Sequence, residues 1–281
     1  VRRTLLIWCG LFCWFDSCAK TRCCIRNNIL QVEHDAKWIK RLSALSKQYF
    51  TPSFFGAEHI DASKPAMYVG NHTLYGIFDS PILIDYLYNQ HKVAVVSIAD
   101  HGHFYLPGWR TLFKKFGAVD GNKEYIRAAM QQGYSILVFP GGGREVLKRK
   151  GEAYQLIWKQ RYGFLKLAQE FNYDIVPFAA LGGDEVFELG FDANQIVESQ
   201  WFQKLLKVPQ LDKLLRHGDV IPSLPKNLIP KRLPFYFQFM PRQNLMHIEN
   251  AEQLADFREQ IQQHIYAGLE HLKQQREVDK V

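Results

Sequence analysis

Cysteine is confined to one end of this sequence. All five cysteines lie in the first 24 residues, and the rest of the 281-residue chain has none. A disulfide framework needs cysteines in the body of the fold, so a disulfide-stabilised domain is excluded. The spacings also lack the paired Cys-x-x-Cys arrangement of a structural zinc site.

Long apolar runs are missing as well. No run approaches the roughly 18 residues that a membrane-spanning helix needs. Residues 5–15 form a shorter, mostly apolar run behind two arginines, similar to a signal-peptide core, but no convincing cleavage site follows. We interpret residues 1–28 as an N-terminal extension, either an anchor, a signal or a non-native start. Residues 29–281 are expected to form a single α/β domain.

Several common catalytic motifs are absent from the sequence. There is no Gly-x-Ser-x-Gly elbow that would present a nucleophilic serine. Neither a Walker phosphate loop nor a G-x-G-x-x-G dinucleotide fingerprint occurs. These absences argue against a covalent acyl-enzyme and against nucleotide-dependent chemistry of the usual kinds.

Positive charge is in excess. Lysine and arginine number 35 against 28 acidic residues, a formal net charge of +7, and aromatic residues make up 14%. Such a surplus suits an anionic partner, whether nucleic acid, a membrane surface or a phosphorylated substrate. No nucleic-acid-binding motif is recognisable. We therefore expect no nucleic-acid partner. We expect a peripheral protein that is attached to an anionic membrane surface, on the cytoplasmic face of that membrane.

Beyond residue 65, short apolar segments alternate with segments of helical periodicity. Strands are expected at 66–69, 93–98, 136–139, 175–178 and 235–239. Helices are expected at 79–89, 122–133, 160–171 and 193–207. The alternation predicts an α/β fold, a sheet covered by helices.

The two ends of the expected domain are helical. Residues 29–50 have apolar side chains near a period of 3.6 with basic residues among them, which predicts an amphipathic helix that packs on the domain or lies on a membrane. A long last helix is expected after Asn250, which can cap it together with Gln253. Residues 217–234 carry four prolines and predict an irregular surface connection.

One group of polar residues follows the first expected strand. Asn71 and His72 come directly after it, and Asp79 stands at the start of the next helix. Sites of α/β proteins form at the carboxyl ends of strands. A histidine there can act as a general base, and a carboxylate at its other nitrogen would fix the tautomer. The alternative is a packed or capping histidine beside an ordinary N-cap aspartate.

A second group follows the strand at 136–139. Gly141, Gly142 and Gly143 precede Arg144 and Glu145. Glycines allow the backbone to approach a ligand, so their N–H groups can face a phosphate or an oxyanion. Arg144 supplies a fixed cation for a phosphate or carboxylate. A plain tight turn would explain the three glycines equally well.

Together these groups resemble the glycerolipid acyltransferase family, which includes the lysophosphatidate acyltransferases. The resemblance covers roughly residues 50–245. It is carried by four blocks in the family's order: Asn71-His72…Asp79, Gly117-Ala118-Val119, Phe139-Pro140-Gly141-Gly142-Gly143-Arg144-Glu145 and Ile175-Val176-Pro177. The glycine-rich third block is similar to the branch that acylates neutral glycerides, with monoacylglycerol and diacylglycerol acyltransferases and plant phytyl ester synthases.

The resemblance implies a mixed, largely parallel sheet and an O-acyltransferase. Such an enzyme moves a fatty acyl group from an acyl thioester to a hydroxyl of a glycerolipid or other lipid alcohol. His72 would be the general base and Asp79 its partner, and Asn71 and residues 141–145 would bind substrate. Acyl-CoA or acyl-carrier protein would be the co-substrate, with no other cofactor and no metal.

The sequence departs from the family pattern at two places, which bear on the His72–Asp79 pair and on the acceptor. The family places its aspartate five residues after the histidine, where Ile77 stands here, and Asp79 is two residues further on. A bulged loop through Tyr75 and Gly76 would bring Asp79 to the histidine. The arginine that closes the second block is absent after Val119, which favours a neutral acceptor over lysophosphatidate. A thioesterase or other hydrolase and a non-catalytic lipid-binding protein are the alternatives.

Overall fold

The computed structural model describes residues 25–26, 29–30, 32–99 and 109–280. Most of the expected N-terminal extension therefore lies outside the described residues. A seven-stranded sheet forms the centre of the described part, in the order β3-β11-β8-β4-β7-β5-β6. Its strands are β3 (Ser53–Phe55), β4 (Ala66–Gly70), β5 (Val95–Ala99), β6 (Ala118–Asp120), β7 (Ser135–Val138), β8 (Asp174–Leu181) and β11 (Tyr236–Phe239).

The sheet is mixed and largely parallel, which confirms the expected fold class. Strands β8, β4, β7, β5 and β6 run parallel to one another. Strand β11 is antiparallel to β8, and β3 pairs in parallel with β11. Two small sheets lie apart from it, one of β1 (Ile25–Arg26) and β2 (Ile29–Leu30), the other of β9 (Leu189–Phe191) and β10 (Leu224–Pro225).

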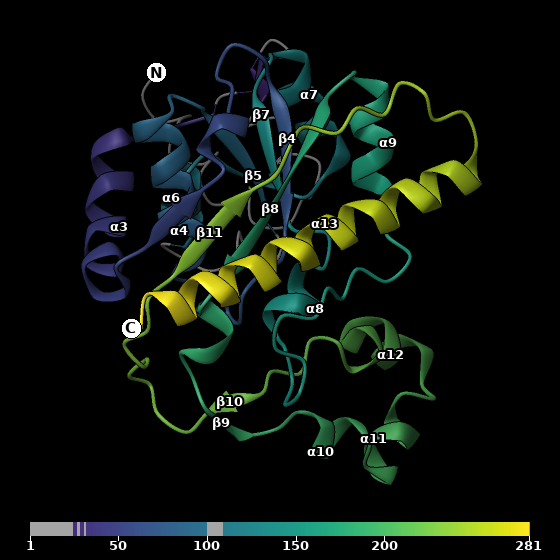
Figure 1. Cartoon of the computed structure of the whole chain (residues 1–281). Coiled ribbons are helices and arrows are strands. Elements are labelled where there is room, and N and C mark those ends of the chain that lie inside the picture. Colours follow the sequence, from purple (N-terminus) through teal and green to yellow (C-terminus); the bar gives the residue numbers. More distant parts are fainter. Residues whose placement is uncertain (1–24, 27–28, 31, 100–108, 281) are drawn as a thin grey trace, which may run out of the picture.

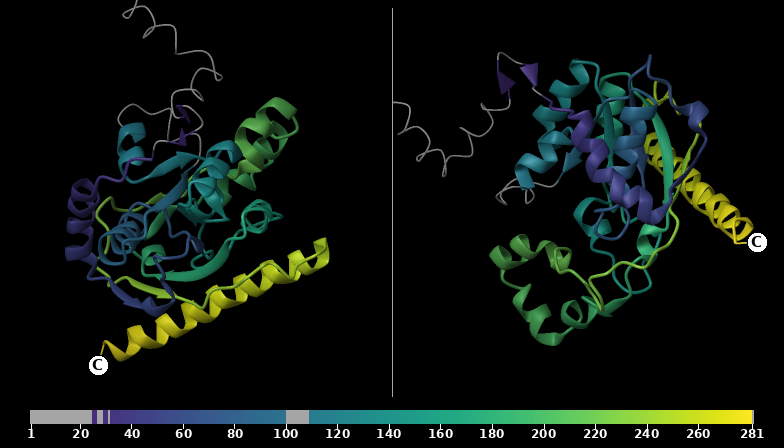
Figure 2. Two further views of the ribbon diagram at one scale, coloured as in Figure 1. Left: turned by 90° about the horizontal axis from the view of Figure 1, so that it is seen from above. Right: turned by 90° about the vertical axis from the view of Figure 1, so that its left-hand side faces the viewer.

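Helices cover both faces of the sheet (Figures 1 and 2). One face packs against α7 (Lys123–Gln131), α9 (Gly163–Glu170) and α13 (Ala251–Val278), and the other against α3 (Ala36–Phe50) and α4 (Asp79–Asp85). Alternate residues of β4 enter the two cores, with Met67 and Val69 on the α13 side and Tyr68 on the α3 side. This alternation is the period of a strand buried on both faces.

The N-terminal amphipathic helix is shorter than expected. It begins at Ala36 because the Asp35 carboxylate accepts hydrogen bonds from the backbone N–H groups of Lys37 and Trp38, both at 3.1 Å. Ile39 and Phe50 of α3 are buried in the core. Residues 29 and 30, expected to be helical, belong instead to β2.

The last helix begins as expected. Asn250 accepts a hydrogen bond from the backbone N–H of Gln253 at 2.9 Å, and the Gln253 side chain accepts from the backbone N–H of Glu249 at 2.8 Å. The apolar stripe of α13 faces β8 and β11. Gly268 permits close packing, because a Cβ there would lie 3.0 Å from the Cβ of Ala179.

The remaining elements are short. Strands β3 and β6 were not expected, because three residues are too few for a periodic pattern. The helix expected at 193–207 is broken into α10 (Asn194–Val197) and α11 (Gln200–Leu205). Other short elements are α6 (Trp109–Lys115), α8 (Gly142–Val146), α12 (Pro209–Leu215), a π-helix at Tyr86–Gln90, and 3-10 turns at Ala57–His59, Gly183–Glu185 and Arg216–Gly218.

Residues 182–225 extend beyond the carboxyl edge of the parallel strands, where β9, β10 and α10–α12 lie below the sheet in Figure 1. The expected irregular connection at 217–234 contains β10 and otherwise little regular structure. Within the described ranges, no helix combines the length and apolar character needed to cross a bilayer.

Candidate active site

His72 follows the carboxyl end of β4, the strand that lies between β8 and β7 in the sheet. Asn71 fixes this exit from the strand. Its side chain donates to the carbonyl of Ala180 and accepts from the Ala180 N–H, both at 2.8 Å, and it is fully buried. Both polar ends of the Asn71 amide are therefore occupied by backbone. Its predicted contact with substrate stays a prediction, and in this structure Asn71 positions its neighbour.

The expected bulge between His72 and Asp79 is present. Tyr75 and Gly76 both adopt left-handed backbone conformations with φ of 61°, and the Gly76 N–H donates to the Thr73 carbonyl at 3.1 Å. The chain turns back on itself there. As a result, His72 Nδ1 lies 3.8 Å from Asp79 Oδ2 although the two residues are seven positions apart. The longer spacing thus still produces a histidine–carboxylate pair.

The His72 ring is confined by Phe139 and by the backbone at Gly76. Phe139 stacks on it with ring centroids 3.9 Å apart and planes inclined by 16°. A Cβ at Gly76 would overlap the imidazole, so only glycine fits there. The side chain is 17% exposed and Nδ1 is buried, which leaves Nε2 as the nitrogen available to a substrate.

The backbone of His72 is held by two ionisable residues of the glycine-rich block and its continuation. The His72 N–H donates to Glu145 Oε1 at 3.3 Å, and the Lys148 ammonium donates to the His72 carbonyl. Lys148 also pairs with Asp184 at 2.9 Å, and both side chains are almost fully buried. Neither Lys148 nor Asp184 was predicted, because nothing in the local sequence links them to a loop more than 70 residues away.

The residues after His72 are held in the same way. Asp79 Oδ2 accepts from the Thr73 N–H at 3.3 Å, and Asp184 Oδ1 accepts from the Leu74 N–H at 2.6 Å. The Tyr75 N–H donates to the Val146 carbonyl at 2.8 Å. With each of these N–H groups paired, the loop presents His72 in one fixed orientation.

Asp79 is suited to support a charged imidazole. It is 2% exposed, and burial alone would raise its pKa. The neighbouring His72 and the hydrogen bonds from Thr73 and Ser80 outweigh burial, so the pKa of Asp79 lies below its ordinary value. The carboxylate is therefore ionised at neutral pH and can stabilise an imidazolium beside it.

Glu145 has the opposite character. It is fully buried, and burial raises its pKa to about 8, although the Lys148 ammonium opposes the shift. One oxygen lies against Gly141, where a Cβ would overlap it, and the other accepts from the His72 backbone. Glu145 thus points into the protein. In this structure Glu145 positions the His72 backbone, and its predicted contact with substrate stays a prediction.

Arg144 is also turned inward. The guanidinium is 8% exposed, pairs with the Glu152 carboxylate, and lies 3.6 Å from Asp219 Oδ1. Its positive charge is balanced inside the protein by these two carboxylates, and its predicted contact with a substrate phosphate or carboxylate stays a prediction. The long-range partner Asp219 could not be anticipated from the local pattern.

The glycine turn leaves one side open. Gly142 adopts a φ of 49° and its N–H donates to the Phe139 carbonyl at 2.9 Å, while a Cβ at Gly143 would meet no atom within 4 Å. The exposed Arg161 donates to the Pro140 carbonyl at 2.7 Å, and a Cβ at Gly142 would lie 2.9 Å from its Nη1. Arg161 brings a solvent-facing cation to this turn, and sequence reasoning missed it because it belongs to no recognisable block.

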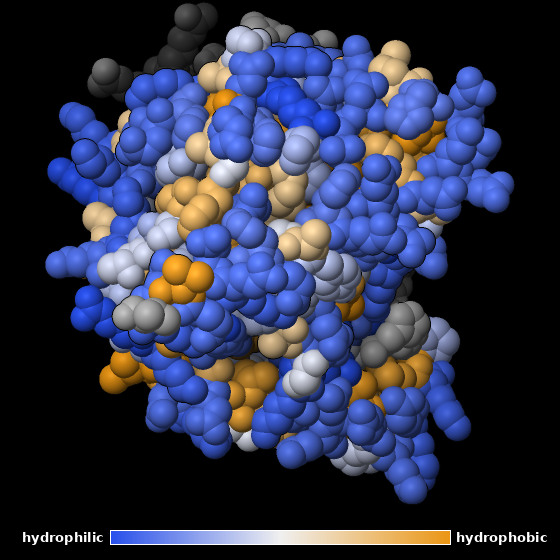
Figure 3. Space-filling model, in the orientation of Figure 1, coloured by the Kyte–Doolittle hydropathy of each residue, from blue (hydrophilic) through white to orange (hydrophobic). Residues whose placement is uncertain are grey.

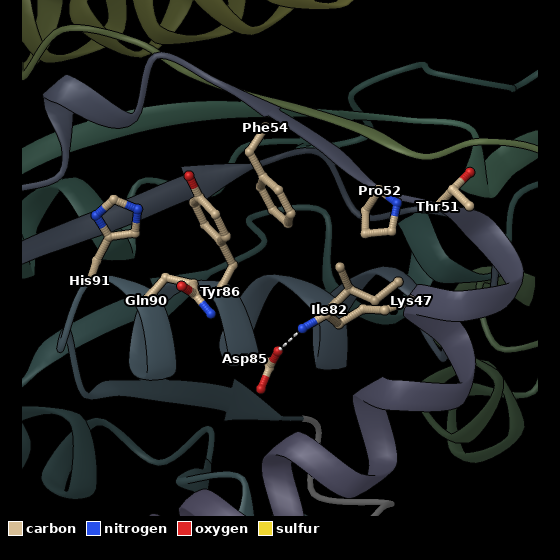
Figure 4. A pocket seen from close by; sticks show the side chains of 9 residues that line it. All are labelled: Lys47, Thr51, Pro52, Phe54, Ile82, Asp85, Tyr86, Gln90 and His91. Carbon is tan, nitrogen blue, oxygen red and sulfur yellow. Dashed lines mark hydrogen bonds and ion pairs between the residues drawn. The ribbon is translucent and has the colours of Figure 1, made fainter.

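A cavity of about 620 Å³ lies elsewhere, between α3 and the carboxyl end of α4 (Figure 4). It is crossed by the ion pair of Lys47 and Asp85, whose charged atoms are 2.7 Å apart. Asp85 is six residues after Asp79, roughly 9 Å along the helix axis. His72 does not line this cavity. In the described ranges, no cluster of three or more His, Cys, Asp and Glu side chains could hold a metal ion.

The sequence and the fold of this chain are similar to those of known proteins. Residues 52–180 match the family model described as Acyltransferase. This matched stretch is just under half of the chain, and it agrees with the resemblance of the chain's motifs to acyltransferases.

Two relatives illustrate the match. The chain is 27% identical over 243 residues to phytyl ester synthase 2 of Arabidopsis thaliana, covering 79% of this chain and 34% of the relative. It is 30% identical over 147 residues to the bovine (Bos taurus) DGAT1/2-independent enzyme synthesizing storage lipids, covering 47% of this chain and 42% of the relative. The chain thus spans less than half the length of either relative.

The fold is also that of a solved enzyme. The 1-acyl-sn-glycerophosphate acyltransferase of Thermotoga maritima superimposes with a TM-score of 0.54 at 15% identity, covering 85% of this chain and 79% of the other. At this identity the likeness shows the α/β fold alone.

Proposed function

We propose that this protein transfers a fatty acyl group from an acyl thioester, acyl-CoA or acyl-carrier protein, to the hydroxyl of a glycerolipid or other lipid alcohol. His72 Nε2 takes the proton as the acceptor oxygen attacks the thioester carbonyl carbon. The carbon–sulfur bond then breaks, and the thiolate leaves with the proton that His72 returns. The products are an ester and a free thiol.

The observation that supports this mechanism is the 3.8 Å approach of His72 Nδ1 to an ionised, buried Asp79. Asp79 orients the ring and stabilises the imidazolium that forms during attack. The backbone bonds that hold the loop keep this geometry in place before substrate binds. Gly143, on the open side of the glycine turn, and Arg161 are suited to the carbonyl oxygen and to the anionic part of the donor, respectively.

A neutral acceptor is favoured. The charge of Arg144 is balanced by Glu152 and Asp219, so this residue offers no free cation to an acceptor phosphate. One relative is named a phytyl ester synthase and another an enzyme synthesizing storage lipids. Both names fit an acceptor hydroxyl without a phosphate beside it. The proposed setting is the surface of a membrane, approached from the cytoplasmic face.

The test is an assay with a radiolabelled acyl thioester and detergent-dispersed acceptors. Monoacylglycerol, diacylglycerol, a long-chain alcohol and lysophosphatidate compete in one mixture, and the labelled products are separated by chromatography. We expect esters of the neutral acceptors to predominate. A preference for lysophosphatidate would refute the acceptor class, and release of free fatty acid alone, with or without acceptor, would identify a thioesterase instead.

A further inference from the structure

The segment between β10 and β11 exposes two large apolar side chains at its tip. Leu228 is 87% exposed and Ile229 is 80% exposed, the two most exposed large apolar side chains of the described residues. Neighbouring aliphatic side chains this open to water are unfavourable in solution unless another phase covers them.

This tip continues into an exposed stripe of α3. Trp38, Leu45 and Tyr49 are spaced seven and four residues apart, so they lie on one side of the helix, and all three are exposed. The Tyr49 hydroxyl donates to the Pro230 carbonyl at 2.8 Å, and Arg232 Nε donates to the Tyr49 carbonyl at 3.3 Å. We call these side chains of α3 and the residues 226–232 the apolar tip surface.

The two segments that form this surface carry positive charge only. Residues 36–50 and 220–248 contain no aspartate or glutamate. Five basic residues of the two segments are exposed: Lys37, Lys40, Arg41, Lys231 and Arg232. Two further lysines, Lys47 and Lys226, pair with Asp85 and Glu188 of neighbouring segments. Figure 3 shows apolar atoms at the lower left edge of the molecule, where Figure 1 draws the chain between β10 and β11 beyond the end of α3.

The apolar tip surface is joined to the candidate active site. The backbone N–H groups of Lys226 and Lys231 donate to the carbonyls of Glu188 and Val186, both within 2.8 Å. Between these anchors, Phe187 packs its ring against Tyr75, with centroids 5.6 Å apart. Tyr75 belongs to the bulge that carries His72, and its hydroxyl donates to the Ser223 carbonyl at 2.7 Å.

From this arrangement we infer that Leu228 and Ile229 insert into the acyl-chain region of an anionic bilayer, with α3 lying at the headgroups beside them. A bilayer is apolar inside, and an anionic one is negatively charged at its surface, so exposed apolar side chains with exposed cations on the same segments suit both layers. Insertion brings the bulge that carries His72 to the layer in which a lipid acceptor resides. The statement about the lipid acceptor rests on the proposed function, whereas the insertion itself does not.

Binding is measured by co-sedimentation of the full chain with phosphatidylcholine vesicles, with and without phosphatidylglycerol, in the absence of substrate. We expect binding to anionic vesicles that Leu228→Ser weakens by about tenfold, because burying a leucine is worth at least the free energy of one factor of ten. Met246→Ser is the matched control, since Met246 is 63% exposed but lies outside the apolar tip surface. Lys231→Gln should weaken binding to anionic vesicles and leave binding to neutral ones unchanged.

Equal binding by wild type and Leu228→Ser would overturn the inference. So would self-association of the wild type in solution that Leu228→Ser abolishes, since the apolar tip surface would then join two copies of the chain. Activity on detergent-dispersed substrate separates the two proposals. Vesicle binding that depends on Leu228 in a protein without transfer activity would support insertion and refute the proposed function, and the reverse result would refute only insertion.

Discussion

The chemistry proposed for this protein depends on the placement of one imidazole. Phe139 and Gly76 fix the plane of the His72 ring, and Asp79 faces its buried nitrogen. Glu145 and Lys148 fix the peptide groups on either side of the residue. A base held in this way loses little entropy when a substrate hydroxyl arrives, because the orientation is set in advance.

Removal of the base tests this placement. We expect His72→Ala and His72→Gln to reduce acyl transfer by about 10²-fold or more, since general-base catalysis contributes 10²–10⁴-fold. The far-ultraviolet circular dichroism should be unchanged. His247→Ala is the control, because His247 is an exposed histidine away from the loop. Near-normal turnover by a folded His72→Ala protein would remove His72 from the mechanism.

The raised pKa of Glu145 predicts how the stability of the protein depends on pH. Its pKa is raised from 4.5 to about 8 in the folded protein, so as pH rises through this interval the unfolded chain releases the proton first. The unfolded state gains from that release, and the free energy of unfolding falls as pH increases from about 4.5 to 8. Glutamine has no proton to release. Glu145→Gln should therefore lose less stability between pH 5 and pH 8 than the wild type.

Urea unfolding at a series of pH values measures this difference. Glu259→Gln, a change at an exposed position of α13, should follow the wild-type pH dependence. If Glu145→Gln follows it as well, Glu145 is ionised in the folded protein at neutral pH.

At the scale of secondary structure, the ends of elements determine the site. Strand β4 delivers His72, the short helix α4 begins at Asp79, and β8 carries the backbone that receives Asn71. The α8 turn supplies Glu145, and Lys148 follows it closely. Because these ends meet at one edge of the sheet, residues distant in sequence surround a single side chain.

The cap of α13 gives a test at this scale. Asn250→Ala removes the acceptor of the Gln253 N–H and should lower the free energy of unfolding by about 1 kcal/mol. Glu259→Ala in the exposed middle of the same helix should change it by less than about 0.5 kcal/mol. Equal effects of the two substitutions in urea unfolding would mean that the cap contributes nothing specific.

At the scale of the whole molecule, the candidate site and the N-terminal segment are separate in the sequence. Every residue assigned to the site lies beyond residue 65. Deletion of residues 1–24 should therefore leave acyl transfer to detergent-dispersed acceptors within about twofold of the full chain, as expected for changes away from the reacting groups. A parallel assay of both proteins decides this. A severe loss of transfer by a folded truncated protein would give the N-terminal segment a part in catalysis.

Sequence patterns were sufficient for the order of the main elements and for the pairing of His72 with Asp79. Strands buried on both faces are continuous apolar runs, and caps such as Asn250 act over a few residues, so both are visible locally. The pairing of Asn71-His72 with Asp79 was expected from motif order, and the bulge from the tight pair Tyr75-Gly76. The three-residue strands β3 and β6 were not, because pairing with neighbours defines them.

Tertiary structure alone decided the roles of the charged residues around His72. Arg144 and Glu145 carry the same local pattern whether they face a ligand or the protein interior, and their partners decide which. Glu152 and Asp219 neutralise Arg144, while burial and the His72 backbone turn Glu145 inward. Lys148 and Asp184 meet only after folding. Exposure of Leu228 likewise depends on what the rest of the chain leaves uncovered, a property of the assembled surface that no local pattern contains.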